Sequence, residues 1–77
     1  MAGKLPSWED RAKRYLKAEL KRADIGYREL ADRLKKHGLE ETEASVANKL
    51  SRGTFPATFM LAALVAIGAE IVKLEDI

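Results

Sequence analysis

The sequence predicts an all-α domain, a bundle of four to five helices, and three observations lead to this fold class. Apolar residues recur at steps of three or four along most of the chain, which is the period of an amphipathic helix. Five glycines and two prolines are too few for the many turns of a domain made of short strands. A chain of 77 residues without an interior linker forms one small domain, residues 1–77.

The first helix is predicted over residues 8–23. Ser7 is a suitable N-cap, and Asp10 lies in the first turn, where the helix dipole favours a negative charge. The apolar face of this helix consists of Trp8, Ala12, Leu16, Leu20 and Ala23. The opposite face carries the basic residues Lys13, Arg14, Lys17 and Lys21. We interpret this basic face as solvated surface, with a secondary phosphate track as the alternative.

The second helix is predicted over residues 27–37. Gly26 precedes it as a tolerated N-cap, and Gly38 follows it in the position where a left-handed residue ends a helix. The apolar stripe consists of Leu30, Ala31 and Leu34. The cations of the last turn, Lys35, Lys36 and His37, suit the negative end of the helix dipole.

The third helix is predicted over residues 43–52, between Thr42 as N-cap and Gly53 as the residue that ends it. Its buried stripe is short and consists of Val46, Ala47 and Leu50. The side chains left facing outward are Ser45, Asn48, Lys49 and Arg52.

The fourth helix is predicted over residues 56–67, with Pro56 near its start, where no hydrogen-bond donor is missed. Residues 59–67 are all apolar, and a helix that is apolar all round must be covered on more than one side. The tail, residues 70–77, suits either a fifth helical turn at Leu74–Ile77 or a short strand. We therefore expect a homodimer whose self-contact uses part of this helix, together with the tail from Ile71 to Ile77.

The predicted core draws on all four helices. Its members are Trp8, Leu16, Leu20, Leu30, Leu34, Val46, Leu50, Phe59, Leu61, Leu64 and Ile67.

Several classes of function are excluded by composition. The chain has no cysteine and a single histidine, His37, so we expect no enzyme activity, no catalytic residues, no metal site and no cofactor. A domain of this size encloses no large cavity beside its core, so we expect no small-molecule substrate. The longest apolar run, residues 59–69, is shorter than the about 20 residues of a membrane span. The N-terminal residues do not resemble a signal peptide, and we expect a cytoplasmic protein.

Charge is distributed unevenly along the chain. Residues 1–38 hold eleven Lys or Arg against six Asp or Glu, a net charge of +5, and residues 39–77 carry a net charge of −3. A basic first half attracts phosphates. Three acids, Glu40, Glu41 and Glu43, gather near the start of the third helix.

Two short amphipathic helices joined by a glycine-containing link, with a longer helix on each side, are the outline of a helix-turn-helix domain. Leu30-Ala31, the run Asn48–Gly53 and Pro56 resemble the Cro/lambda-repressor-like family, in which an apolar helix ending in a pair such as Ile67-Gly68 follows. More closely, these residues with Trp8, the run 17–22 and Phe55 resemble a small bacterial family of single-domain proteins of unassigned function.

The chain departs from the repressor-like pattern at three points. Leu30 and Gly53 lie further apart than in the compact repressors, so either the link between the two motif helices is longer or one of the helices is extended. Ser51 stands where the family has an acid before Arg-Gly, and Tyr27 stands where a glutamine commonly contacts phosphate.

The resemblance implies a DNA-binding protein, a transcriptional regulator whose partner is double-stranded DNA and whose helix 43–52 enters the major groove. Ser45 and Asn48 would then meet base edges, and Lys49 and Arg52 would lie near phosphates. Arg28 would hold the DNA backbone beside the start of helix 27–37. The predicted DNA-binding residues are Tyr27, Arg28, Ser45, Asn48, Lys49 and Arg52.

The alternative is a protein–protein interaction or dimerisation module that uses the apolar helix 58–67 and binds no nucleic acid. The three acids near the start of the third helix favour it, because they would approach phosphates first. Salt-sensitive retention on heparin distinguishes the two functions, since only the DNA-binding function predicts it.

Overall fold

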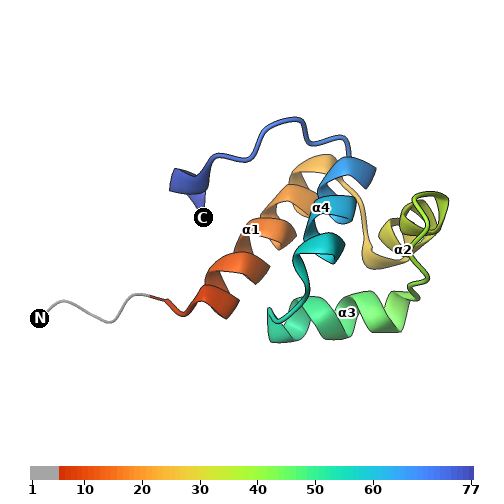
Figure 1. Ribbon diagram of the computed structural model, residues 1–77, viewed down its shortest axis with the longest axis horizontal. Helices are drawn as coiled ribbons and strands as arrows, with labels where there is room; N and C mark the ends of the chain where they lie inside the picture. The colour runs from red at the N-terminus through yellow and green to blue at the C-terminus, as the bar shows by residue number, and fades with distance from the viewer. Residues whose placement is uncertain (1–5) are drawn as a thin grey trace, which may run out of the picture.

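The structure, a computed structural model, describes residues 6–77, and this part of the chain contains four α-helices, one short 3-10 helix and no strand (Figure 1). The elements are α1 (Trp8–Ala23), α2 (Tyr27–Lys36), α3 (Glu43–Arg52), α4 (Ala57–Ala66) and the 3-10 helix η1 (Leu74–Asp76). The predicted all-α fold class is confirmed. Residues 1–5, which the sequence analysis included in the single domain, lie outside the described residues.

The helix ends follow the capping signals of the sequence. The Ser7 hydroxyl accepts a hydrogen bond from the Asp10 amide at 3.1 Å, and Thr42 caps α3 in the same way. The predicted bounds of α1 and α3 are confirmed. The second predicted helix ends one residue early because His37 is its C-cap, and the fourth loses a residue at each end because Pro56 and Ile67 are its caps.

The four helices close into a ring of contacts around the core. α1 packs against α3 and α4, and α2 packs against the same two helices from the other side. Figure 1 shows α3 lengthwise and α2 nearly along its axis, so these two neighbouring helices cross steeply. The steep crossing leaves the side of α3 that faces away from α1 and α2 uncovered.

The core is apolar throughout. Among the described residues, no polar or charged residue is buried. The predicted core members that are buried are Leu16, Leu20, Leu30, Leu34, Val46, Leu50, Phe59 and Leu64. Tyr15, which lies beside the apolar face predicted for the first helix, and Ile25 are also buried, although the predicted core did not include them.

The core prediction was wrong for Trp8 and Leu61, whereas Ile67 is partly buried and packs against the core. Trp8 is 68% exposed, because it lies in the first turn of α1, where the Arg11 guanidinium lies over its ring at 4.0 Å from the ring centre. Leu61 is 62% exposed, because the bundle covers the opposite side of α4, at Phe59 and Ala63. Ile67 is half-buried at the end of α4.

Long cationic side chains satisfy the last carbonyl groups of neighbouring helices. Lys13 Nζ donates to the Ser51 carbonyl oxygen of α3 at 3.2 Å. Arg33 donates to the Ala66 carbonyl oxygen of α4 at 2.9 Å. Helix C-terminal carbonyls lack partners within their own helix and carry negative partial charge, so these bonds join helices where each most needs a donor.

The tail returns from α4 across α1. Gly68, with φ of 84°, turns the chain after α4, and the tail then crosses to the side of α1 seen in Figure 1. The Arg11 guanidinium donates two hydrogen bonds, of 3.2 and 2.8 Å, to the Ile77 carbonyl oxygen. Of the two forms expected for the tail, the helical turn is the one observed, as η1.

Gly53 ends α3 in close contact with the start of α1. Its φ is 74°, in the left-handed region that favours glycine. A Cβ atom at this position would also overlap the Glu9 carbonyl oxygen. The absence of a side chain therefore lets the backbone of α3 touch the backbone of α1.

We predict that Leu50→Ala lowers the free energy of unfolding by about 2–5 kcal/mol, because it leaves a cavity in a fully buried site. The same substitution at Leu61, which is 62% exposed, serves as the control and should cost at most about 0.5 kcal/mol. Urea denaturation measures both values. Equal losses of unfolding free energy at the two positions would contradict the observed orientation, in which α3 turns Leu50 into the core and α4 turns Leu61 toward solvent.

We predict that Gly53→Ala destabilises the fold clearly more than Gly68→Ala. Both glycines have positive φ, so alanine costs roughly 1 kcal/mol or more of backbone strain at either position. Only at Gly53 would the new methyl group meet the backbone, whereas nothing lies within 4 Å of a Cβ at Gly68. Thermal denaturation of the two variants isolates the contact with Glu9, and indistinguishable midpoints would argue against it.

Candidate nucleic-acid interface

One side of α3 is open to solvent along its whole length. The exposed residues Ala44, Asn48, Ser51 and Arg52 follow one another at helical spacing, and we call them the α3 outer face. Val46 and Leu50 lie on the opposite side, fully buried. The amphipathicity of α3 therefore presents small and polar side chains outward.

Two of the predicted site residues lie on the α3 outer face. Asn48 and Arg52 are exposed and one helical turn apart. Within residues 6–77, neither side chain forms a hydrogen bond or an ion pair, so both retain their full capacity toward a ligand. An asparagine amide offers a donor and an acceptor, and an arginine offers a fork of donors.

Ser45 is engaged at the start of α3, and its predicted contact with base edges stays a prediction. Its hydroxyl oxygen accepts from the Thr42 amide at 2.8 Å and lies 2.6 Å from Glu41 Oε1, to which it donates. The Thr42 hydroxyl in turn accepts from the Ser45 amide at 3.0 Å. Together these bonds form a reciprocal cap that satisfies backbone donors at both residues.

Lys49 is engaged with Glu41 and lies near Phe59, and its predicted contact with phosphates stays a prediction. Its ammonium group lies 3.1 Å from Glu41 Oε1, and it is 5.6 Å from the centre of the Phe59 ring. The Glu41 side chain is only 11% exposed, so this pair is partly removed from water. Glu41, Ser45 and Lys49 lie four residues apart, but Glu41 precedes α3, so this spacing alone did not predict the network.

Fewer free carboxylates lie near the start of α3 than the three acids of the sequence, Glu40, Glu41 and Glu43, suggest. Glu41 lies half-buried within the Ser45–Lys49 network, where the ammonium of Lys49 balances its charge. Of the three neighbouring acids, Glu40 and Glu43 remain exposed. Two solvated carboxylates therefore border the start of α3, one fewer than the sequence places there.

The start of α2 carries the other two predicted site residues. Arg28 is exposed and has no ion pair within the described part of the chain. Tyr27 is half-buried and packs against the core. The structure thus places Asn48 and Arg52 on the α3 outer face, Arg28 on the preceding helix, and Tyr27 against the core.

The basic face predicted for α1 divides into two parts. Lys13 is half-buried between Asp10, at 3.5 Å, and the end of α3. Arg14, Lys17 and Lys21 are exposed, and none has an ion pair among residues 6–77. The exposed part begins at Arg14, directly after Lys13 in the chain, so the positive surface of α1 adjoins the end of α3.

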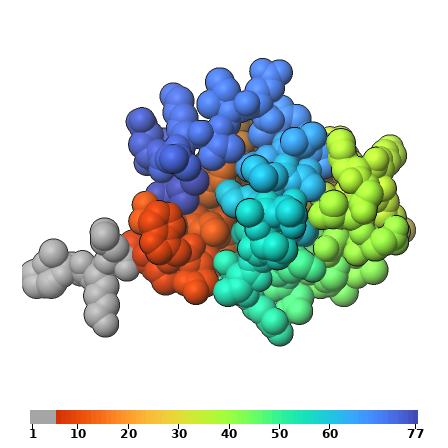
Figure 2. All heavy atoms as spheres, in the orientation of Figure 1, coloured from red at the N-terminus to blue at the C-terminus, as the bar shows by residue number. Residues whose placement is uncertain are grey.

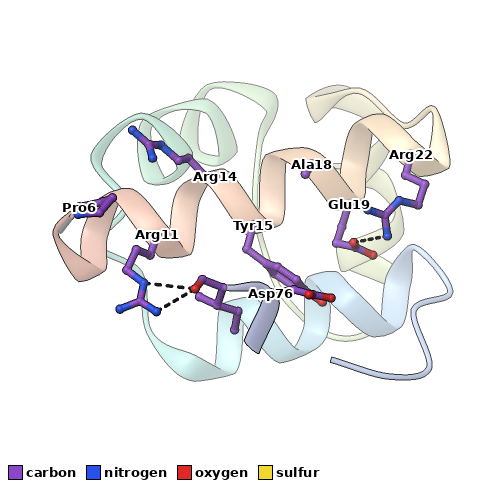
Figure 3. A pocket seen from close by; sticks show the side chains of 9 residues that line it. Pro6, Arg11, Arg14, Tyr15, Ala18, Glu19, Arg22 and Asp76 are labelled. Atoms are coloured by element: carbon purple, nitrogen blue, oxygen red, sulfur yellow. Dashed lines mark hydrogen bonds and ion pairs between the residues drawn. The ribbon is translucent and has the colours of Figure 1, made fainter. Parts of the chain in front are cut away.

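A hollow of about 360 Å³ between α1 and the tail gathers several arginines but forms no anion site (Figure 3). Arg22 is held by Glu19 at 2.7 Å, and Arg11 by the Ile77 carbonyl oxygen. Figure 3 shows Arg14 pointing to the other side of α1. Burial raises the pKa of Tyr15 above its ordinary value, and the nearby carboxylates of Glu19 and Asp76 raise it further, so the Tyr15 hydroxyl stays protonated at neutral pH.

Other kinds of site find no support in the described residues. Within residues 6–77, no group of three or more histidine, cysteine, aspartate or glutamate side chains is placed to hold a metal ion. No helix in this part of the chain has both the length and the apolar character needed to cross a membrane.

Comparison with known proteins identifies a family without an assigned activity. Searches of curated proteins and of solved structures give no match. One family pattern, described as a domain of unknown function (DUF6471), matches residues 8–72, the segment that holds all four α-helices and the first part of the tail. Because the match covers most of the chain, the protein belongs to the DUF6471 family.

Proposed function

We propose that this protein binds double-stranded DNA and regulates transcription, with α3 lying in the major groove as the second helix of a helix-turn-helix. The observation that carries the proposal is the α3 outer face, which is exposed over its whole length and free of acidic side chains. The major groove is about 12 Å wide and accepts one α-helix with its side chains. The small side chains of Ala44 and Ser51 permit a close approach.

The contacts proposed for α3 follow from its exposed groups. Asn48, in the middle of the face, pairs two ways with the edge of an adenine. Ala44, one turn nearer the start, contacts a thymine methyl group. Arg52, at the end of the helix, binds a phosphate, which supplies affinity without sequence information.

The remaining contacts lie beside α3. Arg28, in the first turn of α2, binds a backbone phosphate, where the positive end of the helix dipole assists it. Tyr27 holds this turn against the core and so positions Arg28. Ser45 and Lys49 are left out of the proposed interface because both are engaged with Glu41.

We predict that DNA affinity falls as the salt concentration rises, because the protein binds DNA partly through contacts with phosphates. Arg52→Ala should remove one of these contacts. The slope of log K against log [salt] should become shallower by about 0.9, and affinity should fall for every sequence alike. Fluorescence anisotropy with pooled duplexes at several salt concentrations measures this. Lys36→Ala, at an exposed position at the end of α2, is the matched loss of charge and should leave the slope unchanged.

We predict that Asn48→Ala blurs the preference at one base pair, at a cost of about 1–3 kcal/mol there, and leaves the salt slope intact. Selection from a random duplex pool, repeated with the variant, reads this out. Absence of any duplex binding by the wild type at low salt, or binding that appears only after Glu43→Gln, would overturn the DNA proposal.

A second candidate function is a protein-interaction module that binds no nucleic acid. The apolar side of α4 favours it, since Leu61 and Val65 are 62% and 59% exposed. A protein that ignores heparin at low salt but forms a stable oligomer would fit this function and not the first.

A further inference from the structure

An apolar surface lies where α4 meets the tail. A groove of about 250 Å³ runs between them. Its walls include Met60, Leu61 and Leu64 of α4, and Val72, Leu74 and Ile77 of the tail. No charged residue lines the groove, so water inside it meets almost only hydrocarbon.

Large apolar side chains stand exposed at the edges of this groove. Leu61 is 62% exposed and Leu74 is 79% exposed, although both also line the groove. Val65, one turn after Leu61, is 59% exposed and widens the apolar surface along α4. Figure 2 shows α4 open on this face, beside the tail and uncovered by another element.

We propose that a second copy of this chain covers the α4–tail groove, in a homodimer with two-fold symmetry. The same surface holds a hollow and, at its edge, protruding leucines. A two-fold axis brings each patch against itself, so Leu61 of one protomer can enter the groove of the other, and the reverse holds at the same time. Because the protruding Leu61 side chain and the groove lie side by side, this apolar surface is complementary to the same surface of a second copy.

The charges at the edge of the groove fit the same partner. Lys73 and Glu75 flank Leu74 in the chain, and both are exposed. In an antiparallel pairing of two identical tails, residues before Leu74 in one chain face residues after it in the other. Lys73 of each protomer then meets Glu75 of its partner, and opposite charges lie across the rim. α4 itself carries no acidic or basic residue that would select a charged partner.

The size of the surface determines how strong the dimer is. A stable interface takes about 20–30 residues from each partner, and the groove with its neighbours supplies far fewer. The dimer therefore forms reversibly and depends on protein concentration. It does not depend on the DNA-binding proposal.

Sedimentation equilibrium over about 10 µM to about 1 mM protein tests the proposal. We expect a dimer dissociation constant on the order of hundreds of micromolar. The weight-average mass should rise from 8.6 kDa toward twice that value as concentration rises. The double variant Leu61→Glu/Leu74→Glu should raise the dissociation constant at least tenfold. Both positions are exposed, so the variant should keep the wild-type circular dichroism, and Leu61→Gln/Leu74→Gln provides an uncharged version.

Ala44→Glu is the matched control, because it also places a glutamate at an exposed apolar position, on the α3 outer face. It should leave the dimer intact and abolish the proposed DNA binding, so the two proposals fail separately. A protein that stays monomeric at every concentration overturns the dimer. A dimer that persists in both double variants overturns the assignment of the groove.

Discussion

The contact between Gly53 and the backbone of Glu9 determines how α3 lies in this fold. Two helices approach most closely where one of them has no side chain, and here the end of α3 touches the first turn of α1. Lys13, one turn further along α1, then reaches the Ser51 carbonyl oxygen and holds the same end a second time. With this end fixed and Val46 and Leu50 in the core, the rotation of α3 about its axis is settled. The same rotation turns Asn48 and Arg52 outward, so the orientation of the proposed interface is a consequence of packing at the C-terminal end of the helix.

Much of the positive charge of this protein is used inside the structure. Arg11, Lys13 and Arg33 donate to carbonyl oxygens of other segments, and Lys49 pairs with Glu41. The net charge of the first half of the chain therefore overstates what a phosphate backbone would meet. An arginine or lysine at a helix C-terminus stabilises the fold through the helix dipole and the unpaired carbonyls together, and its hydrocarbon stem covers apolar surface. The net charge of a segment indicates which partners it attracts only when the cationic side chains that bind groups of the same chain are left out of the count.

The helices and most of the core could be predicted from the sequence because the signals are local. Ser7, Thr42 and Gly53 mark helix ends through hydrogen bonds and backbone angles that depend on a few neighbouring residues. The buried side of α4 could not be predicted, since every residue after Thr58 in this helix is apolar and the sequence has no pattern that says which side faces inward. The roles of Ser45 and Lys49 were missed for another reason. Both residue types suit a DNA-contacting helix, and nothing in their local sequence shows that Ser45 serves the cap or that Lys49 pairs with Glu41, eight residues before it. Whether Asn48 and Arg52 meet DNA stays a prediction.

The way the tail is attached gives the molecule a second, weaker level of organisation. The tail beyond Gly68 is anchored at its far end by the bonds from Arg11 to the Ile77 carbonyl oxygen, and few of its side chains are buried. Segments with little buried apolar surface open at a lower free energy than the whole domain, so the tail can detach while the four helices stay folded. Each detachment removes one wall of the α4–tail groove. In amide hydrogen exchange, Asp76 and Ile77 would then report this local opening, and self-association would slow their exchange by trapping the closed form.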